Sequence, residues 1–206
     1  MKLFKEMLER NVVSSNAMIT GFSQNGYGEK ALEIFGQMQL AGLKPEEKTF
    51  VSVLPGCADM EALDYGMEIH EKVLSSGFQS DVVVLNSLID MYVKCGCIQK
   101  AHALFDRMHG KDTVSWNTMI TGYAQNGLLD EALKVFNEIG QRDMISWSAM
   151  ISRLAQNGQG KEALKLFQQM QLVGIMPDSK TFASILPACG NLAALEQGMK
   201  IQGRVK

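Results

Sequence analysis

Two short glycine-containing segments match a pattern that binds dinucleotides in some enzymes. They begin at Gly26 and Gly158, read GYGEKA and GQGKEA, and fit G-x-G-x-x-A. That pattern binds a pyrophosphate only where it follows a β-strand and opens the helix of a βαβ unit. Here each segment follows a helical pattern, and Asn126-Gly127 takes the same place without the second glycine. We interpret these segments as turns between helices, and we expect no cofactor.

The three histidines, His70, His102 and His109, are the candidates for acid–base catalysis. A general base needs a group that orients it and a substrate within hydrogen-bond reach. The sequence predicts a helix interface for His70 and no partner for the other two. The His-x-Glu and Pro-Cys-x-x-Cys signature of zinc deaminases is also missing. We therefore expect no catalytic residue, and a protein that is not an enzyme.

The cysteines are candidates for a disulfide or a metal site. Cys57 and Cys189 occupy the same place in two copies of one repeat, so we expect them to lie in separate units. Cys95 and Cys97 form a Cys-x-Cys pair without a second pair at zinc-ligand spacing. All four are expected to pack as small apolar side chains in a reducing compartment, and no metal site is predicted.

The chain that holds these residues is repetitive. Residues 12–46 return in similar form at 144–178, and 49–69 return at 181–201. A shorter motif recurs four times, as ALEIFGQM, AHALFDRM, ALKVFNEI and ALKLFQQM. Such periods are typical of solenoids, in which each small unit buries its apolar face against its neighbours. The expected fold is all-α, a right-handed α-solenoid of helix-turn-helix repeats.

Composition sets limits on the function. Apolar residues make up 46% of the chain, which is typical of a folded protein. No stretch approaches eighteen apolar residues, so no membrane span is predicted. The net charge of −2 and the pI of about 5.9 argue against strong non-specific binding to nucleic acid.

Residues 113–143 illustrate the expected hairpin. Asn126-Gly127 is expected to end the first helix, because glycine tolerates a left-handed backbone. Asp130 and Glu131 then fall in the first turn of the second helix, where acidic side chains favour the positive end of the helix dipole. The predicted apolar face of the first helix is Val114, Trp116, Met119, Ile120 and Tyr123, and that of the second is Ala132, Leu133, Val135, Phe136 and Ile139.

Apolar residues that recur at one place in the repeat predict packing positions rather than a cofactor site. Ser15 stands where Trp116 and Trp147 stand in other repeats, so we expect looser packing in the first complete repeat. The recurring sets are Met18, Met119 and Met150; Met38, Met108 and Met170; and the pairs Ala31/Phe35, Ala101/Phe105, Ala132/Phe136 and Ala163/Phe167.

Four longer segments of the repeats are VSWNTMITGYAQNG, ALKLFQQMQLVGIMPD, TFVSVLPGCADMEALDYGMEIH and LNSLIDMYVKCGCIQKAHALFDRM. They resemble the pentatricopeptide repeat (PPR) family, specifically its plant PLS subclass, and the resemblance covers the whole chain. The related tetratricopeptide repeats carry a W-x₂-L-G-x₂-Y signature that is missing here. The resemblance implies the following units: 1–11, the end of a preceding repeat; 12–46, P-type; 47–81, L-type; 82–112, S-type; 113–143, short S-type; 144–178, P-type; and 179–206, a truncated L-type.

The resemblance implies binding of single-stranded RNA, with one base read by each P- or S-type repeat. In the family the fifth and last residues of a repeat choose the base, and the second residue packs against it. The implied base-reading pairs are Asn16/Glu46, Asn86/Asp112, Asn117/Asp143 and Ser148/Asp178, and the implied base-packing residues are Val13, Val83, Val114 and Ile145. An Asn or Asp at a helix start can be a cap alone, but four pairs in phase favour base contact.

Under the family's pairing rule, Asn with Asp favours U and Ser with Asp favours G, whereas Asn16 with Glu46 indicates a pyrimidine. The L-type units carry Val51 and Ala183 at the fifth position, and Lys48 and Lys180 at the second. We expect these units to be spacers or protein-contact surfaces. The predicted RNA element is therefore 5′-Y-N-U-U-G-3′.

The resemblance further implies the recognition part of an organellar RNA-processing factor, with C-to-U editing as the expected process. An editing cofactor or a deaminase protein is an expected partner; a membrane and a small-molecule substrate are not. The organelle, mitochondrion or chloroplast, stays open, and residues 1–11 do not resemble a transit peptide. The alternatives are a protein-interaction scaffold without base preference and a non-functional fragment of a longer protein.

Overall fold

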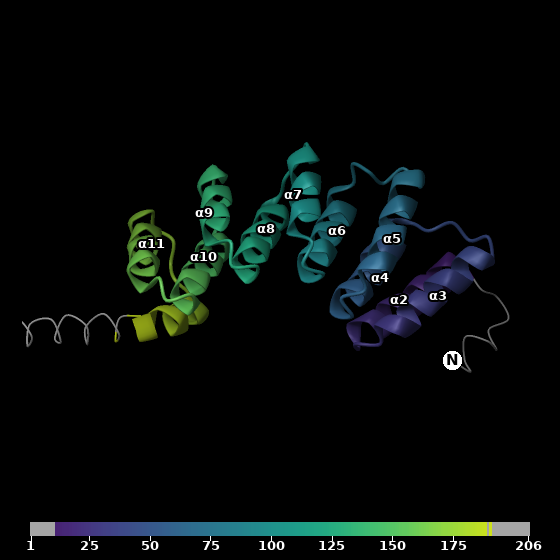
Figure 1. Cartoon of the computed structure of the whole chain (residues 1–206), viewed down its shortest axis with the longest axis horizontal. Helices are drawn as coiled ribbons and strands as arrows, with labels where there is room; N and C mark the ends of the chain where they lie inside the picture. Colours follow the sequence, from purple (N-terminus) through teal and green to yellow (C-terminus); the bar gives the residue numbers. More distant parts are fainter. Residues whose placement is uncertain (1–10, 189, 191–206) are drawn as a thin grey trace, which may run out of the picture. The chain divides into compact units, whose positions relative to one another are not determined.

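The described part of the chain consists of paired α-helices (Figure 1). The structure is a computed structural model that describes residues 11–188 and 190. No β-strand occurs in that part of the chain, and the predicted all-α fold of helical hairpins is confirmed. The helices are α2 (Val12–Gln24), α3 (Gly28–Leu40), α4 (Glu47–Asp59), α5 (Leu63–Ser75), α6 (Val82–Lys94), α7 (Ile98–Arg107), α8 (Thr113–Gln125), α9 (Leu129–Glu138), α10 (Met144–Gln156) and α11 (Gly160–Leu172), and residues 179–188 are also helical.

The chain divides into two compact units, one up to Ser115 and one from Trp116 onward. In the first unit, α4 contacts α2 and α6, so the first helices of successive hairpins lie side by side. The second helix of each hairpin in this unit contacts its own first helix. In the second unit, α10 contacts both α9 and α11. Within each unit, neighbouring hairpins therefore cover one another, which is how repeat proteins build a core.

The turn inside each hairpin follows the sequence prediction. α8 ends at Gln125, and Gly127 has a φ of 75°, a left-handed conformation that favours glycine. The N–H of Leu128 donates to the carbonyl of Tyr123 at 2.8 Å, which closes the helix end. Gly26, Gly96 and Gly158 have the same positive φ at equivalent turns.

The dinucleotide-like glycines are confirmed as parts of helix–helix turns. Gly28 opens α3 after a turn rather than a strand. A Cβ placed on Gly28 would lie 2.7 Å from the carbonyl oxygen of Gly56 in α4. The second glycine of the pattern therefore allows two helices to approach closely.

Most of the recurring apolar residues are in the core. The four alanines of the Ala/Phe pairs are fully buried, and Phe35, Phe105 and Phe136 are buried with them. Phe167 is only half-buried and stacks edge-on against Phe182. Met18 is also half-buried, whereas the other methionines of the two recurring sets are buried.

The predicted apolar face of α8 is wrong in one respect. Met119, Ile120 and Tyr123 are buried and Trp116 is half-buried, but Val114 is exposed. Residues two apart in a helix point about 200° from each other, so Val114 and Trp116 cannot share a face. Val114 instead shares a face with Asn117, three residues later.

The predicted face of α9 also needs a correction. The helix ends at Glu138, and Ile139 follows in an extended conformation. Its side chain is nevertheless buried, because the extended residue turns back towards the core. Leu133 is only half-buried.

The three cysteines that the structure describes are free thiols that differ in burial. Cys57 is buried, and burial, with a smaller contribution from Cys95, raises the pKa of its thiol to about 12. Cys95 and Cys97 are half-buried free thiols, and Cys189 lies outside the described residues. No helix among the described residues has the length and apolar character needed to cross a membrane.

Candidate nucleic-acid interface

The second residue of four first helices is an exposed, β-branched apolar side chain. The exposed fractions are 76% for Val13, 49% for Val83, 55% for Val114 and 55% for Ile145. Such side chains are normally buried, so their exposure at one repeat position is informative. The fifth residue lies three residues further along each helix and therefore on the same face. Each of these helices thus places an exposed apolar side chain next to a polar one.

The polar fifth residues are not free surface groups. Asn16, Asn86 and Ser148 are buried, and Asn117 is half-buried. Burial of an amide or hydroxyl is costly unless it is hydrogen-bonded. The hydrogen bonds formed by these side chains therefore decide how they can act.

Asn16 is held by the following repeat. The hydroxyl of Thr49, the third residue of α4, donates to Oδ1 of Asn16 at 2.7 Å. The same hydroxyl accepts from the backbone N–H of Glu46 at 3.0 Å, which caps α4. Glu46, the last residue of its repeat, is exposed. Thr49 thus connects the two members of the predicted pair.

Asn86 and Asp112 are in direct contact. Nδ2 of Asn86 donates to Oδ1 of Asp112 at 3.0 Å. The hydroxyl of Ser115, the third residue of α8, lies 2.7 Å from Oδ1 of Asn86 and 2.8 Å from Oδ1 of Asp112. The backbone N–H of Ser115 also donates to Oδ1 of Asp112, at 2.8 Å. All three residues belong to the first unit, and they form one connected network.

This network keeps the Asp112 carboxylate ionised. Partial burial alone would raise the pKa of Asp112, but the hydrogen bonds from Ser115 and Asn86 outweigh it. The pKa of Asp112 is therefore lower than its ordinary value. At neutral pH this position presents a fixed negative charge that accepts hydrogen bonds.

The pair Asn117/Asp143, in the second unit, is arranged differently. Asp143 caps α10, accepting from the backbone N–H of Ser146 at 2.8 Å and from its hydroxyl at 2.7 Å. Oδ1 of Asn117 is buried and has no hydrogen-bond partner among the described residues. The structure therefore does not join Asn117 to Asp143 through this hydroxyl.

Ser148 and Asp178 are joined by Thr181. The hydroxyls of Ser148 and Thr181 are 2.5 Å apart. The backbone N–H of Thr181 donates to Oδ1 of Asp178 at 2.7 Å, and its hydroxyl contacts the same oxygen. Hydrogen bonds from Thr181 lower the pKa of Asp178 from its ordinary value. This pair is therefore also bridged by the third residue of the next helix.

Sequence reasoning missed the bridging residues Thr49, Ser115 and Thr181, and the equivalent Ser146, which contacts Asp143 alone. A signal for them was present, because a Ser or Thr three residues after an Asp or Glu is a helix-capping pattern. It indicated helix starts but not contact with a residue about thirty positions earlier. That contact depends on how successive hairpins stack.

The L-type positions have a different character. Val51 is half-buried and Lys48 is exposed on α4. In the helical segment 179–188, Ala183 and Lys180 are both exposed. Neither fifth residue carries a polar group, so these two segments do not repeat the arrangement seen in the other four.

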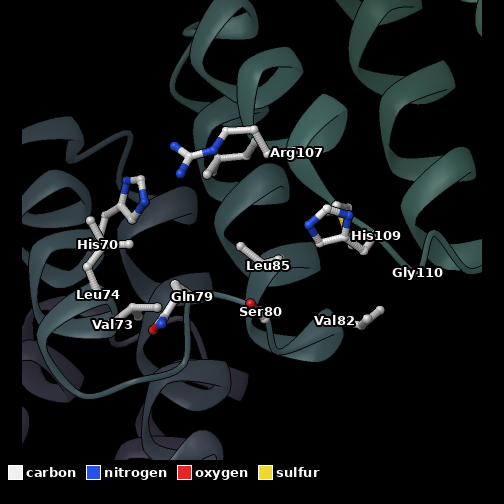
Figure 2. A pocket seen from close by; sticks show the side chains of 12 residues that line it. His70, Val73, Leu74, Gln79, Ser80, Val82, Leu85, Arg107, His109 and Gly110 are labelled. Atoms are coloured by element: carbon white, nitrogen blue, oxygen red, sulfur yellow. The ribbon is translucent and has the colours of Figure 1, made fainter.

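The other candidate residues have local partners. His70 borders a cavity of about 180 Å³ in the first unit, together with Arg107 and His109 (Figure 2). Its Nδ1 is 2.9 Å from the hydroxyl of Tyr92 on α6, so His70 lies at a helix interface as predicted. Burial, opposed by nearby Glu71 and assisted by Lys100 and Arg107, lowers the pKa of His70.

The prediction that His102 lacks a partner is wrong. Its Nε2 lies 3.1 Å from the carboxylate of Asp106, one helical turn further along α7. Lys94 in α6 is likewise paired, 3.1 Å from Asp90 and 3.8 Å from Asp59. Among the described residues, no cluster of three or more His, Cys, Asp or Glu side chains could hold a metal ion.

The stacked hairpins, with one polar and one apolar position recurring on their first helices, define an α-helical repeat protein. Residues 10–59 and 142–191 match the PPR repeat family, and 83–112 and 114–144 match the PPR repeat. These matches cover most of the chain, which therefore belongs to the PPR repeat family.

Curated relatives agree with this assignment. A pentatricopeptide repeat-containing protein of Arabidopsis thaliana is 30% identical over 202 residues, which is 98% of this chain and 24% of the relative. The A. thaliana pentatricopeptide repeat-containing protein DOT4, chloroplastic, is 42% identical over 111 residues, 53% of this chain and 13% of the relative. The chain thus spans a quarter or less of these relatives.

Solved structures share the fold. The pentatricopeptide repeat protein PPR10 from maize matches with a TM-score of 0.76 and 21% identity, over 98% of this chain and 31% of that one. A second PPR10 structure, in complex with an 18-nt psaJ RNA element, matches with a TM-score of 0.60 and 22% identity, over 91% of this chain and 34% of that one.

Proposed function

We propose that this chain binds single-stranded RNA in a sequence-specific manner, with one base bound by each P- or S-type repeat. The observation that carries the proposal is the exposed β-branched residue at the second position, beside a polar fifth residue held by hydrogen bonds. An unstacked base offers a flat apolar face and a polar edge. The two side chains match these two parts of a base.

The proposed roles follow from position. Val13, Val83, Val114 and Ile145 pack against base faces, as their exposure allows. The pairs Asn16/Glu46, Asn86/Asp112, Asn117/Asp143 and Ser148/Asp178 contact base edges. The proposed element remains 5′-Y-N-U-U-G-3′, in which the second base faces the L-type repeat 47–81 and is not selected.

The proposed cellular role rests on similarity to related proteins. A PPR10 structure contains an RNA element, and DOT4 is named chloroplastic. We infer that this chain is the recognition part of a PLS-type organellar factor, in C-to-U editing, in a chloroplast or mitochondrion. In this proposal the chain recognises the target sequence on the RNA, and an editing cofactor or deaminase protein carries out the reaction.

The first test is fluorescence anisotropy with short labelled RNAs. One contains CAUUG, a second replaces UUG by GGU, and a third is the DNA equivalent of the first. Tighter binding of the CAUUG RNA is expected, because the pairs at the last three positions favour U, U and G.

A variant then tests the assignment of residues. Asn117→Ser should shift the preference at the fourth base from U towards G, because it converts an Asn/Asp pair into a Ser/Asp pair. Asn137→Ser, the same change on an exposed residue of α9, is the matched control and should leave the preference unchanged. Equal binding of all three nucleic acids by the folded chain would refute the proposal and favour a protein-interaction scaffold.

A further inference from the structure

The hydroxyls at the third position of the first helices make contacts of two kinds. Thr49, Ser115, Ser146 and Thr181 each sit at the third position of a first helix and contact the last residue of the preceding repeat. These contacts cap helices and need no further explanation. Thr49, Ser115 and Thr181 also contact the fifth residue of the preceding repeat, at 2.5–2.7 Å. Capping does not require this second contact.

The second contact determines the orientation of the Asn side chain. The backbone N–H groups of Glu46 and Asp112 donate to the hydroxyls of Thr49 and Ser115, at 3.0 and 3.2 Å. A hydroxyl that accepts there directs its own proton elsewhere, and in both cases Oδ1 of the Asn lies in reach, although Oδ1 of Asp112 is also 2.8 Å from the hydroxyl of Ser115. The Asn oxygen therefore turns towards the hydroxyl, and the –NH₂ group takes the other side. At Asn86 that group donates one proton to Oδ1 of Asp112 at 3.0 Å, which favours the same orientation, and keeps its second proton for a base.

Orientation matters for base choice because the two ends of an amide are opposites. The –NH₂ group donates and the oxygen accepts. Uracil carries the O4 acceptor at the edge where cytosine carries the N4 donor. An Asn with its –NH₂ group towards the RNA favours uracil, and a flipped Asn favours cytosine. One rotation of the side chain thus exchanges two pyrimidines.

We propose that the third-position hydroxyl is a positioning residue for the base read by the repeat before its own. Ser115, together with Asp112, orients the amide of Asn86, and Thr49 orients that of Asn16, so that each amide favours uracil over cytosine. This inference rests on the proposed RNA binding and adds a determinant outside the second, fifth and last residues. Its distinctive consequence is that a substitution in one repeat alters selectivity at the base read by the preceding repeat.

Ser146 provides an internal comparison. Its hydroxyl lies 2.7 Å from Oδ1 of Asp143, and Oδ1 of Asn117 has no partner among the described residues. Ser146 therefore caps α10 without orienting the preceding Asn. Loss of this hydroxyl removes a cap of the same kind but no contact with a base-reading side chain.

The experiment measures U-to-C selectivity separately at two bases. The RNAs carry CAUUG, CACUG and CAUCG, which change the third or the fourth base to C. Affinities are measured for the whole chain, for Ser115→Ala, for Ser115→Thr and for Ser146→Ala, and circular dichroism checks that each variant is folded. In the proposed register, Asn86 contacts the third base and Asn117 contacts the fourth.

Ser115→Ala should lower the U-to-C affinity ratio at the third base about fivefold, the size expected for one lost hydrogen bond. The ratio at the fourth base should stay unchanged, although Ser115 lies in the repeat that reads it. Ser115→Thr should retain the third-base ratio because it keeps the hydroxyl. Ser146→Ala should alter neither ratio.

Thr49→Val, which removes a hydroxyl while keeping the shape, repeats the test at the first base, with UAUUG against CAUUG, if Ser115→Ala does not fold. There the U-to-C ratio should fall in the same way. A parent chain that selects uracil, with variants that keep its ratios and lose only thermal stability, would overturn this inference and leave the proposed function intact. A parent chain without base preference would overturn both.

Discussion

At the scale of single residues, two buried serines of the first unit differ in whether their hydroxyls have partners. Ser115 bonds both Asn86 and Asp112. Ser15 is fully buried, and its Oγ has no partner among the described residues. It occupies the place of Trp116 and Trp147, so the first complete repeat has both a smaller side chain and an unsatisfied polar atom there.

Ser15→Ala should therefore stabilise the protein, by about 1 kcal/mol, because it removes an unpaired buried hydroxyl and favours the helix. Ser115→Ala is the matched comparison and should destabilise it by about 1–2 kcal/mol, because it leaves Asn86 without its donor. Urea denaturation followed by circular dichroism measures both changes. If Ser15→Ala destabilised the protein as much as Ser115→Ala, the Ser15 hydroxyl would not be the unpaired group that the structure shows.

Asp112 and Asp178 give the protein a predictable dependence on acid. Their pKa values are lowered in the folded state by the hydrogen bonds of Ser115 and Thr181. A lowered folded pKa means that the unfolded chain binds protons first as pH falls. Their contribution is therefore complete above about pH 5 and is lost progressively below about pH 4.

The urea midpoint should accordingly fall between pH 5 and pH 3, in the approximate window set by the ordinary carboxyl pKa. Asp112→Asn should reduce this fall, because the substituted side chain cannot be protonated there. If the urea midpoint of Asp112→Asn fell with pH as steeply as that of the parent chain, the Asp112 carboxylate would not contribute to the acid dependence of stability.

At the scale of elements, α3 and α4 approach closely at Gly28. The Cα of Gly28 is the point of contact, and a Cβ there would lie 2.7 Å from the carbonyl oxygen of Gly56. Gly36 lies in the same helix, but a Cβ on it would meet nothing within 4 Å. Close packing therefore requires a glycine at position 28 of α3 but not at position 36.

Gly28→Ala should destabilise the protein by about 1–3 kcal/mol, because α3 and α4 must separate to admit the methyl group. Gly36→Ala should stabilise it by about 0.5–1 kcal/mol through helix propensity alone. Thermal unfolding by calorimetry distinguishes the two variants. Equal shifts in melting temperature would mean that the contact with Gly56 relaxes without cost.

At the scale of the whole molecule, the charge balance limits electrostatic binding. The chain carries 20 Lys and Arg against 22 Asp and Glu. Lys94 on α6 lies within ion-pair distance of Asp90 and Asp59. Base contacts, rather than phosphate contacts, should then supply most of the affinity.

The affinity for RNA should therefore depend only shallowly on salt, with a log–log slope of about −1 to −2, equivalent to two or three phosphates for a single strand. Anisotropy titrations from 50 to 300 mM KCl would measure it. Asp90→Asn should steepen the slope slightly by releasing Lys94. A log–log salt slope steeper than about −4 for the parent chain would contradict the prediction. It would indicate that basic side chains contact many phosphates.

The sequence by itself determined the hairpins and their phase. Gly127 marked a turn, and Ala132 with Phe136 marked a buried face, because helix periodicity and glycine conformation depend on neighbours within a few residues. These features need no knowledge of the rest of the chain. The resemblance to the family supplied the second and fifth positions, whereas helix periodicity alone had put Val114 on the buried face.

Only the tertiary structure decided which partners those residues have. Asn86 meets Ser115, 29 positions later, whereas Asn117 does not meet Ser146 although the spacing is the same. A hydrogen bond changes over tenths of an ångström, and its geometry depends on how two hairpins stack and on which acceptor competes for the hydroxyl proton. Sequence spacing fixes neither, so the orientation of a base-reading amide is a property of the stack.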